Sequence, residues 1–119
     1  MIAVFDVDGT LDACPREFQS MMSALKAAAH QVHILTGVDN DPPTQQDWDE
    51  KCAYLAAMGM AECWDKLILV PRDRLIAQRK AAYLASVRAD VFVDNSEENV
   101  AAAAQAGVPL CLLPWQTRI

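Results

Sequence analysis

The sequence predicts an α/β fold: a three-layer, Rossmann-like arrangement in which a parallel sheet of about five strands carries helices on both faces. Short, mostly apolar runs alternate along the chain with longer segments whose apolar residues recur at helical spacing. The apolar runs contain few polar residues, which is typical of parallel strands buried on both faces. With 119 residues, 53% of them apolar, the chain can bury a core, and we expect a single domain over residues 1–119.

The chain is expected to begin with a strand and a helix. Residues 2–5 are all apolar, as a strand covered on both faces requires. In residues 15–29 the apolar side chains recur every three or four positions, which predicts an amphipathic helix with Pro15 near its start. The methionines of this stripe, Met21 and Met22, are expected in the core rather than at a ligand site.

A second strand and a second helix follow. Residues 31–35 are expected to form a strand that Thr36 and Gly37 end. A polar stretch with two prolines comes next and indicates a loop. Thr44 and Asp47 have the spacing of a capping box, which predicts a helix directly after it.

The second half of the chain continues the alternation. The remaining strands are expected at residues 67–70, 91–93 and 110–113, and the remaining helices at residues 76–87 and 97–106. Pro71 closes the third strand, and Gly107 ends the last helix. The pattern leaves open whether Trp64 and Trp115 lie in the core or at the surface.

Composition and charge exclude several classes of protein. A net charge of −6 argues against a broad nucleic-acid surface. Six of the ten basic residues lie between positions 66 and 88. They form either an ordinary solvated surface or a local binding site for an anionic substrate. No apolar stretch approaches the roughly 20 residues that span a bilayer, and no signal peptide is visible. We therefore expect a cytoplasmic protein without membrane contact, whose four scattered cysteines are reduced thiols rather than zinc ligands.

The feature that indicates function lies directly after the first strand, in the string DVDGT. Asp6 and Asp8 are two residues apart, and two such carboxylates need a cation or hydrogen-bond donors to stay ionised together. Hard oxygen ligands of this kind suit Mg²⁺. Gly9 permits a sharp turn, and Thr10 adds a hydroxyl and a backbone N–H. The simpler alternative is a turn that carries two solvated acids.

Polar residues also follow other predicted strands. Asp6 follows the first strand, Thr36 the second and Asp94 the fourth. Ligands of open parallel sheets bind beyond the carboxyl ends of the strands, where these three residues are expected to gather. The sequence therefore predicts one site at this edge of the sheet.

The DVDGT string resembles the first motif of the haloacid dehalogenase (HAD) superfamily, whose members are mostly Mg²⁺-dependent phosphatases. The resemblance implies that Asp6 is the nucleophile that takes up the phosphoryl group and that Asp8 is the general acid and base. It further implies that Thr36, with Gly37 beside it, binds the transferring phosphoryl group.

The family also requires a lysine or arginine ahead of a helix and an acidic segment after the fourth strand. Lys80 lies 14 residues before Asp94, a spacing similar to that of compact members, and Arg79 is the competing candidate. A solvated helix lysine is the alternative interpretation of Lys80. In the family the acidic segment holds the metal, which implies that Asp94 and Asn95 bind Mg²⁺ together with Asp6 and Asp8. Asn95 departs from the family, because this position is usually acidic, and this weakens the expected metal affinity.

The chain leaves no room for the cap domain of larger HAD enzymes, so we expect an open site for a phosphomonoester on a nucleotide, a nucleic-acid end or another bulky molecule. The order of motifs resembles the 3′-phosphatase domains of polynucleotide kinases, which implies that Arg72 and Arg74 contact backbone phosphates. A receiver domain has a similar length, but its phosphorylated aspartate would end the third strand, where this chain has Val70 and Pro71. A second alternative is a HAD-like binding or regulatory protein that Asn95 has weakened as a catalyst. The oligomeric state is left open.

Overall fold

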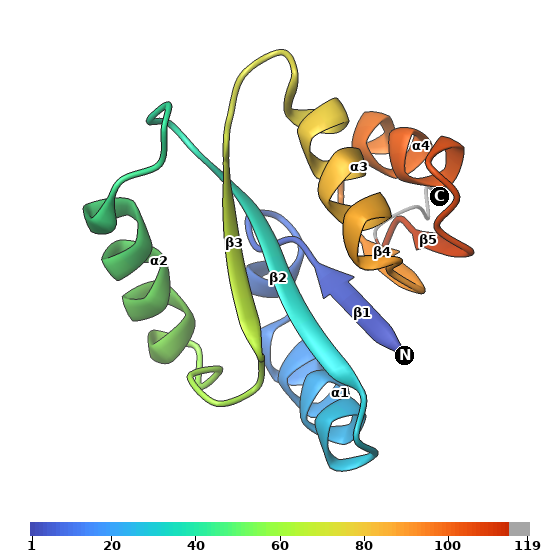
Figure 1. The fold of residues 1–119 in the computed structure, drawn as a ribbon. Coiled ribbons are helices and arrows are strands. Elements are labelled where there is room, and N and C mark those ends of the chain that lie inside the picture. Colours follow the sequence, from blue (N-terminus) through green and yellow to red (C-terminus); the bar gives the residue numbers. More distant parts are fainter. Residues whose placement is uncertain (115–119) are drawn as a thin grey trace, which may run out of the picture.

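A computed structural model describes residues 1–114 of the chain (Figure 1). Its elements in chain order are β1 (Ile2–Phe5), the short 3-10 helix η1 (Leu11–Ala13), α1 (Pro15–Ala27), β2 (Gln31–Val38), α2 (Gln45–Ala57), β3 (Lys66–Pro71), α3 (Ile76–Val87), β4 (Val91–Val93), α4 (Glu97–Gln105) and β5 (Leu110–Leu112). The alternation of strand and helix confirms the predicted α/β class. Trp115 lies outside the described residues.

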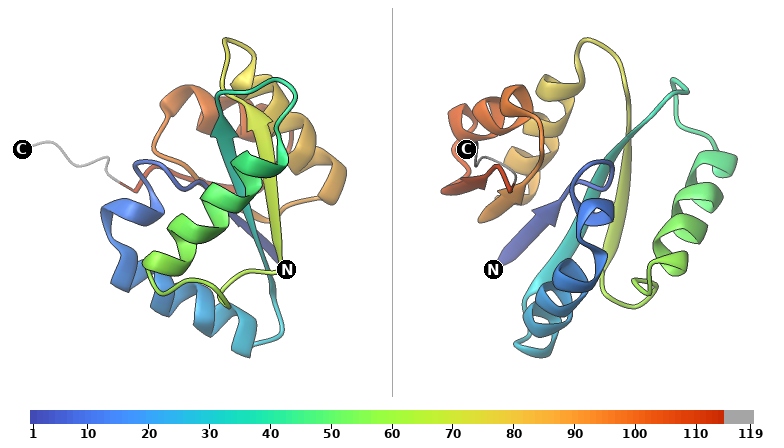
Figure 2. Two further views of the ribbon diagram at one scale, coloured as in Figure 1. Left: turned by 90° about the vertical axis from the view of Figure 1, so that its left-hand side faces the viewer. Right: turned by 180° about the vertical axis from the view of Figure 1, so that it is seen from behind.

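The five strands form one all-parallel sheet in the order β3-β2-β1-β4-β5. Helices α1 and α2 cover one face of this sheet, and α3 and α4 cover the other (Figure 2). The connection order changes direction between β1 and β4, and sheets of this type bind ligands in the crevice beyond such a switch point. Nothing inserted within residues 1–114 forms a separate cap domain.

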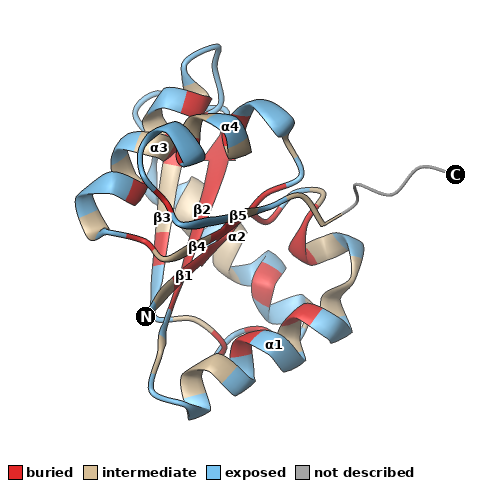
Figure 3. Ribbon diagram, turned by 90° about the vertical axis from the view of Figure 1, so that its right-hand side faces the viewer, coloured by how far each residue is buried: buried red, intermediate tan, exposed pale blue. Residues whose placement is uncertain are grey.

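The core has two parts because side chains alternate along each strand. Phe5 and Ile34 face α1 and α2, where Phe18 packs edge-on against Phe5 with 6.0 Å between the ring centroids. Val4 and Phe92 face the opposite way and pack with Leu84 and other residues of α3 and α4. Buried residues accordingly follow the strands and the inner sides of the helices (Figure 3). Both faces of the central strands are therefore buried, as their apolar residues predict, whereas Leu110 and Leu112 of the edge strand β5 are exposed.

The predicted end of β2 is wrong. The strand continues through Thr36 and Gly37 to Val38, because its ladder with β3 extends to the pairs Gly37 with Val70 and Val38 with Pro71. Gly37 is not a turn residue. A Cβ atom there would lie 2.8 Å from Cδ1 of Ile76, so glycine permits the close approach of the β3–α3 connection.

The predicted capping box of α2 is confirmed, but the expected burial of Met21 and Met22 holds only for Met22, because Met21 is 49% exposed. Thr44 and Asp47 form a reciprocal capping box at the start of α2. Trp64 is partly buried and packs edge-on against Trp48, with 6.5 Å between the ring centroids, so it belongs to the core on the α1–α2 side. In the part of the chain that the structure describes, no helix has both the length and the apolar character needed to cross a bilayer.

Candidate active site

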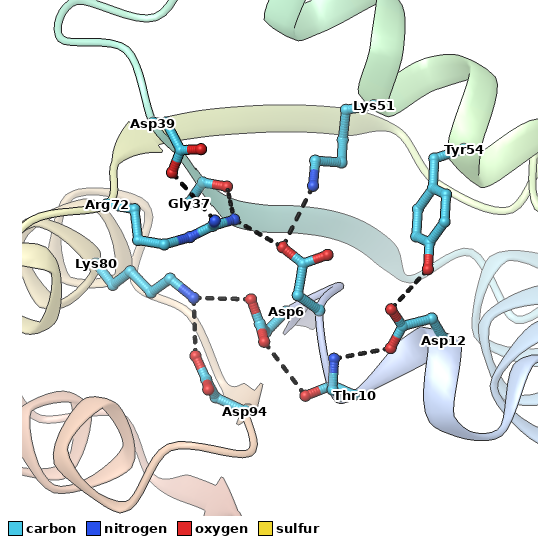
Figure 4. A network of polar contacts seen from close by, with 12 residues as sticks. Asp6, Thr10, Asp12, Gly37, Asp39, Lys51, Tyr54, Arg72, Lys80 and Asp94 are labelled. Carbon is cyan, nitrogen blue, oxygen red and sulfur yellow. Dashed lines mark hydrogen bonds and ion pairs between the residues drawn. The ribbon is translucent and has the colours of Figure 1, made fainter.

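Three charged side chains meet in the crevice beyond the carboxyl ends of β1 and β4 (Figure 4). The Lys80 ammonium donates to Oδ1 of Asp6 at 2.9 Å and to Oδ2 of Asp94 at 2.8 Å. Asp6 directly follows β1 and Asp94 directly follows β4, so two neighbouring strands bring the acids to the same place. Lys80 lies one helical turn from both Ile76 and Leu84 on the core-facing stripe of α3, which directs its side chain inward.

This Asp6–Lys80–Asp94 cluster is almost entirely removed from solvent. The exposed fractions are 5% for Asp6, 2% for Lys80 and 1% for Asp94, so the interpretation of Lys80 as a solvated helix lysine is wrong. Burial raises the pKa of Asp6 to about 6, although the attraction of Lys80 opposes the rise. With all three groups ionised, the cluster carries one net negative charge and can accommodate a further positive group.

The segment after β4 holds Asp94 in place. Its Oδ1 accepts from the backbone N–H of Ser96 at 2.9 Å, and its Oδ2 accepts from Nδ2 of Asn99 at 3.0 Å. Ser96 is in turn the N-cap of α4 and accepts from the backbone N–H of Asn99. The start of α4 therefore fixes the carboxylate that binds Lys80.

Asp8 lies on the open side of the site and has different partners. Its Oδ2 accepts from Nη2 of Arg72 at 2.9 Å and from Nζ of Lys51 at 3.4 Å, and its side chain is 47% exposed. Arg72 also donates to the backbone oxygen of Gly37 at 2.8 Å and to Oδ1 of Asp39 at 3.2 Å. The two aspartates of the opening motif thus differ in environment: Asp6 is buried and Asp8 is accessible to a ligand.

The turn between the two aspartates and η1 is anchored to α2. Oδ1 of Asp12 accepts from the backbone N–H of Gly9 at 2.7 Å, and its Oδ2 accepts from the hydroxyl of Tyr54 at 2.8 Å. Thr10, which is fully buried, donates to Oδ2 of Asp6 at 3.3 Å. These bonds set the position of the loop that carries Asp8.

Asn95 contributes an amide to the same crevice. The end of this amide that faces the cluster lies 3.2 Å from the backbone oxygen of Asp8 and 3.3 Å from Oδ2 of Asp6. Both neighbours are acceptors, so in the absence of a cation the amide nitrogen takes this position and donates to both. Rotated by half a turn, the amide presents its oxygen instead, and three oxygen atoms face one another.

Three facing oxygens of this kind suit a hard divalent cation such as Mg²⁺, so these residues fit the expected metal. Within residues 1–114, no group of three or more His, Cys, Asp or Glu side chains is arranged to hold a metal ion. The candidate metal site therefore depends on one carboxylate, one backbone carbonyl and one amide. Neither the Asp8 carboxylate, which faces Arg72, nor Asp94, which binds Lys80, faces this point in the structure.

Thr36 carries a buried hydroxyl that lacks a partner within residues 1–114. Its Oγ1 forms no hydrogen bond with any described residue, and the residue is fully buried. Phe5 pairs with Ile34 across the sheet, so Thr36 lies two residues further along β2, at the edge where β1 ends. An orphaned buried hydroxyl costs free energy, and a phosphoryl oxygen bound at this edge would supply its missing partner.

The structure brings most of the predicted residues together, but not all of them. Arg79 pairs with Asp73 at 3.1 Å, outside the cluster that Lys80 joins. Arg74 is exposed and forms no hydrogen bond or ion pair with the cluster within residues 1–114. The bonds and charge of Arg79 lower the pKa of Asp73, and the charge of Arg74 helps to lower it further. Two arginines of the predicted substrate seat therefore stand apart from the crevice.

Sequence reasoning missed the contribution of α2. Lys51 lies between Trp48 and Leu55 on the core-facing stripe of this helix, and a charged residue in such a stripe is the signal that could have identified it. Tyr54 follows one turn later, with Nζ of Lys51 5.9 Å from the centre of its ring. The sequence around Asp12 contains no such signal, because the anchoring role of Asp12 depends on its hydrogen bond to Tyr54 of α2.

The fold and the crevice define an α/β protein with an Asp–Lys–Asp cluster at the switch point of a parallel sheet. No family model matches the chain, and neither a curated protein nor a solved structure matches it significantly. The chemistry of the crevice is therefore what indicates the function.

Proposed function

We propose that this protein is a HAD-type phosphatase, a hydrolase that splits a phosphomonoester through an aspartyl-phosphate on Asp6 with Mg²⁺ as cofactor. The observation that carries the proposal is the convergence of three residues that are far apart in the chain. The carboxylates of Asp6 and Asp94 both lie within 2.9 Å of the Lys80 ammonium. The Thr36 hydroxyl, which has no partner within residues 1–114, supports it as a donor that is free to bind a phosphoryl oxygen. We also propose a cytoplasmic location, since all four cysteines are free thiols.

The proposed reaction has two steps. A carboxylate oxygen of Asp6 attacks phosphorus in line, the bond from phosphorus to the ester oxygen breaks, and Asp8 protonates that oxygen as the alcohol leaves. Asp8 then removes a proton from a water molecule, whose oxygen attacks phosphorus. The bond from phosphorus to Asp6 breaks, and inorganic phosphate is released.

The surrounding groups stabilise the charge that gathers on the phosphoryl oxygens. Lys80 offsets the negative charge at Asp6, and Thr36 offers a hydrogen bond. Mg²⁺, held by Asp6, the backbone oxygen of Asp8 and Asn95, would add positive charge at the transferring group. Asp8 suits an acid–base role because it lies at the open side, where a leaving group and water can reach it.

Hydrolysis of p-nitrophenyl phosphate tests the proposal. The wild type is expected to hydrolyse it with Mg²⁺ and not with EDTA, and Asp6→Asn is expected to lower the rate by roughly 10⁴-fold or more. Asp49→Asn, at an exposed acid of α2 outside the crevice, is the matched control and should retain the wild-type rate. Steady turnover by Asp6→Asn would refute the assignment of the nucleophile.

A HAD-like binding or regulatory protein is the second candidate, and Asn95 favours it. An amide in place of an acid removes one negative charge from the candidate metal site, which weakens the attraction for a divalent cation. The same assay, together with calorimetry of inorganic phosphate binding, separates the two candidates. A wild-type protein that binds inorganic phosphate but hydrolyses no ester would support the second.

A further inference from the structure

A cavity of about 320 Å³ opens beside Asp8, between α2 and the end of β2. This volume is at the lower end of the roughly 300–1,000 Å³ typical of small-molecule sites. Its wall includes Lys51 and Arg72, the two cations that contact Asp8. We call it the Asp8 cavity.

The position of the Asp8 cavity matters because of the proposed role of Asp8. The acid that protonates the ester oxygen must touch it, so the rest of the leaving alcohol extends from that point. Lys51 and Arg72 hold Oδ2 of Asp8 at 3.4 and 2.9 Å and also line the cavity, so an alcohol that touches Asp8 has the cavity beside it. A larger hollow of about 500 Å³, lined by Gln19 and Cys63 among others, shares no residue with this wall.

The wall offers hydrogen-bond acceptors and donors together. Oε1 of Glu50 accepts from Gln46, whereas Oε2 of Glu50 and the amide oxygen of Gln46 have no partner among the described residues. Asp39 likewise has one oxygen bound to Arg72 and one without a described partner. Lys51 and Arg72 are positively charged and provide N–H donors on the same wall. A hydroxyl group donates and accepts at once, and so it matches such a mixed wall.

The same wall disfavours other leaving groups. Among residues 1–114, Val38 is the only bulky apolar side chain of this wall, and no aromatic ring of this part of the chain lines it for stacking on a nucleobase. Its three carboxylates, on Asp39, Asp47 and Glu50, would repel the phosphates of a nucleic-acid strand. Arg72, expected to contact such phosphates, is instead paired with Asp8 and Asp39.

We infer that the Asp8 cavity binds the leaving alcohol and that the substrate is the phosphomonoester of a small polyhydroxylated alcohol, such as a sugar or polyol. This inference rests on the proposed phosphatase function. It differs from the nucleic-acid end that the order of motifs suggests.

A substrate panel with Mg²⁺ tests the inference: a hexose 6-phosphate, glycerol 3-phosphate, a nucleoside 5′-monophosphate, a 3′-phosphorylated oligonucleotide and p-nitrophenyl phosphate. We expect kcat/KM for the better of the two polyol esters to exceed that for the nucleotide and the oligonucleotide by at least about tenfold. Glu50→Ala should lower the ratio of kcat/KM for the polyol ester to that for p-nitrophenyl phosphate by about tenfold. Asp49→Ala, on the same helix but outside the cavity wall, should leave this ratio unchanged.

Calorimetry provides a readout that does not depend on turnover. Asp6→Asn is expected to bind the intact polyol ester about tenfold more tightly than Asp6→Asn combined with Glu50→Ala. Failure to hydrolyse any ester overturns the proposed function and this inference together. Hydrolysis of p-nitrophenyl phosphate with equal or better use of the nucleotide or the oligonucleotide, or with no change in the ratio for Glu50→Ala, overturns the inference and leaves the phosphatase standing.

Discussion

Replacement of Lys80 by methionine tests how far the buried cluster depends on its one cation. The ammonium has two carboxylate partners at 2.9 and 2.8 Å, and Coulomb attraction at these distances is about 6 kcal/mol per pair for an effective dielectric constant of about 20. Desolvation offsets most of this attraction, and removal of one partner from a buried pair typically costs about 3–5 kcal/mol. Lys80→Met leaves Asp6 and Asp94 facing each other without the cation, so we expect a loss in this range.

The assay is urea unfolding followed by tryptophan fluorescence at pH 7, with EDTA present so that no metal ion replaces the lost charge. It measures the loss of about 3–5 kcal/mol directly as a lower free energy of unfolding, and thermal unfolding should show a Tm lower by roughly 10–25 °C for a chain of this length. Arg79→Met is the matched control, because it removes a basic residue of the same helix whose pair with Asp73 is solvated and worth about 0–1 kcal/mol. Addition of Asp6→Asn to Lys80→Met should restore part of the lost stability, since one of the two opposing charges disappears.

The reasoning would be refuted if Lys80→Met lost no more stability than Arg79→Met. It would also fail if Asp6→Asn made the Lys80→Met protein still less stable. Either result would mean that the ammonium does not bridge the two carboxylates in the folded protein.

Two further predictions concern the loop and the core. Gly9→Ala is expected to destabilise the fold by about 1–3 kcal/mol more than Gly107→Ala in urea unfolding. Both glycines have positive φ, but only at Gly9 would a Cβ atom overlap the Asn95 amide. Equal losses of stability in the two variants would contradict this. His33 is buried against Tyr83, and burial lowers its pKa below the usual 6.5. The unfolded chain therefore binds a proton at His33 more readily than the folded protein does. Because of this, the folded state loses stability as the pH falls below about 6.5. The wild type should therefore lose stability relative to His33→Gln between pH 7.5 and 5.5, and an unchanged difference between the two proteins would exclude this account.

The fold was largely predictable because apolar residues follow two distinct patterns along the chain. Apolar runs gave the strands, and helical spacing gave the helices, as for α3 at residues 76–87. The end of β2 was not predictable in the same way. Thr36 and Gly37 resemble a turn locally, and only the pairing with β3 shows that the strand continues. Tertiary hydrogen bonds therefore override the local preference at this point.

The candidate site was predictable where the strands themselves place its residues. Asp6 and Asp94 follow adjacent strands, and Lys80 lies on a stripe whose apolar neighbours were visible in the sequence. The partners of Asp8 were not predictable as a set. Lys51 lies 43 positions from Asp8 and Arg72 lies 64 positions from it, and the geometry of α2 and of the β3–α3 connection decides that both reach the same oxygen.

Asp6 is the proposed point of covalent attachment, and its modification during turnover tests the central claim most directly. Reaction with p-nitrophenyl phosphate and Mg²⁺ is stopped with acid, and the protein is digested with trypsin. The mass of the tryptic peptide that ends at Arg16 is then measured by mass spectrometry. We predict a fraction of this peptide that is heavier by one phosphoryl group, which fragmentation assigns to Asp6 and which is lost in Asp6→Asn. Substrate hydrolysis that continues with this peptide unmodified, or with the phosphoryl group on another residue, would contradict the account.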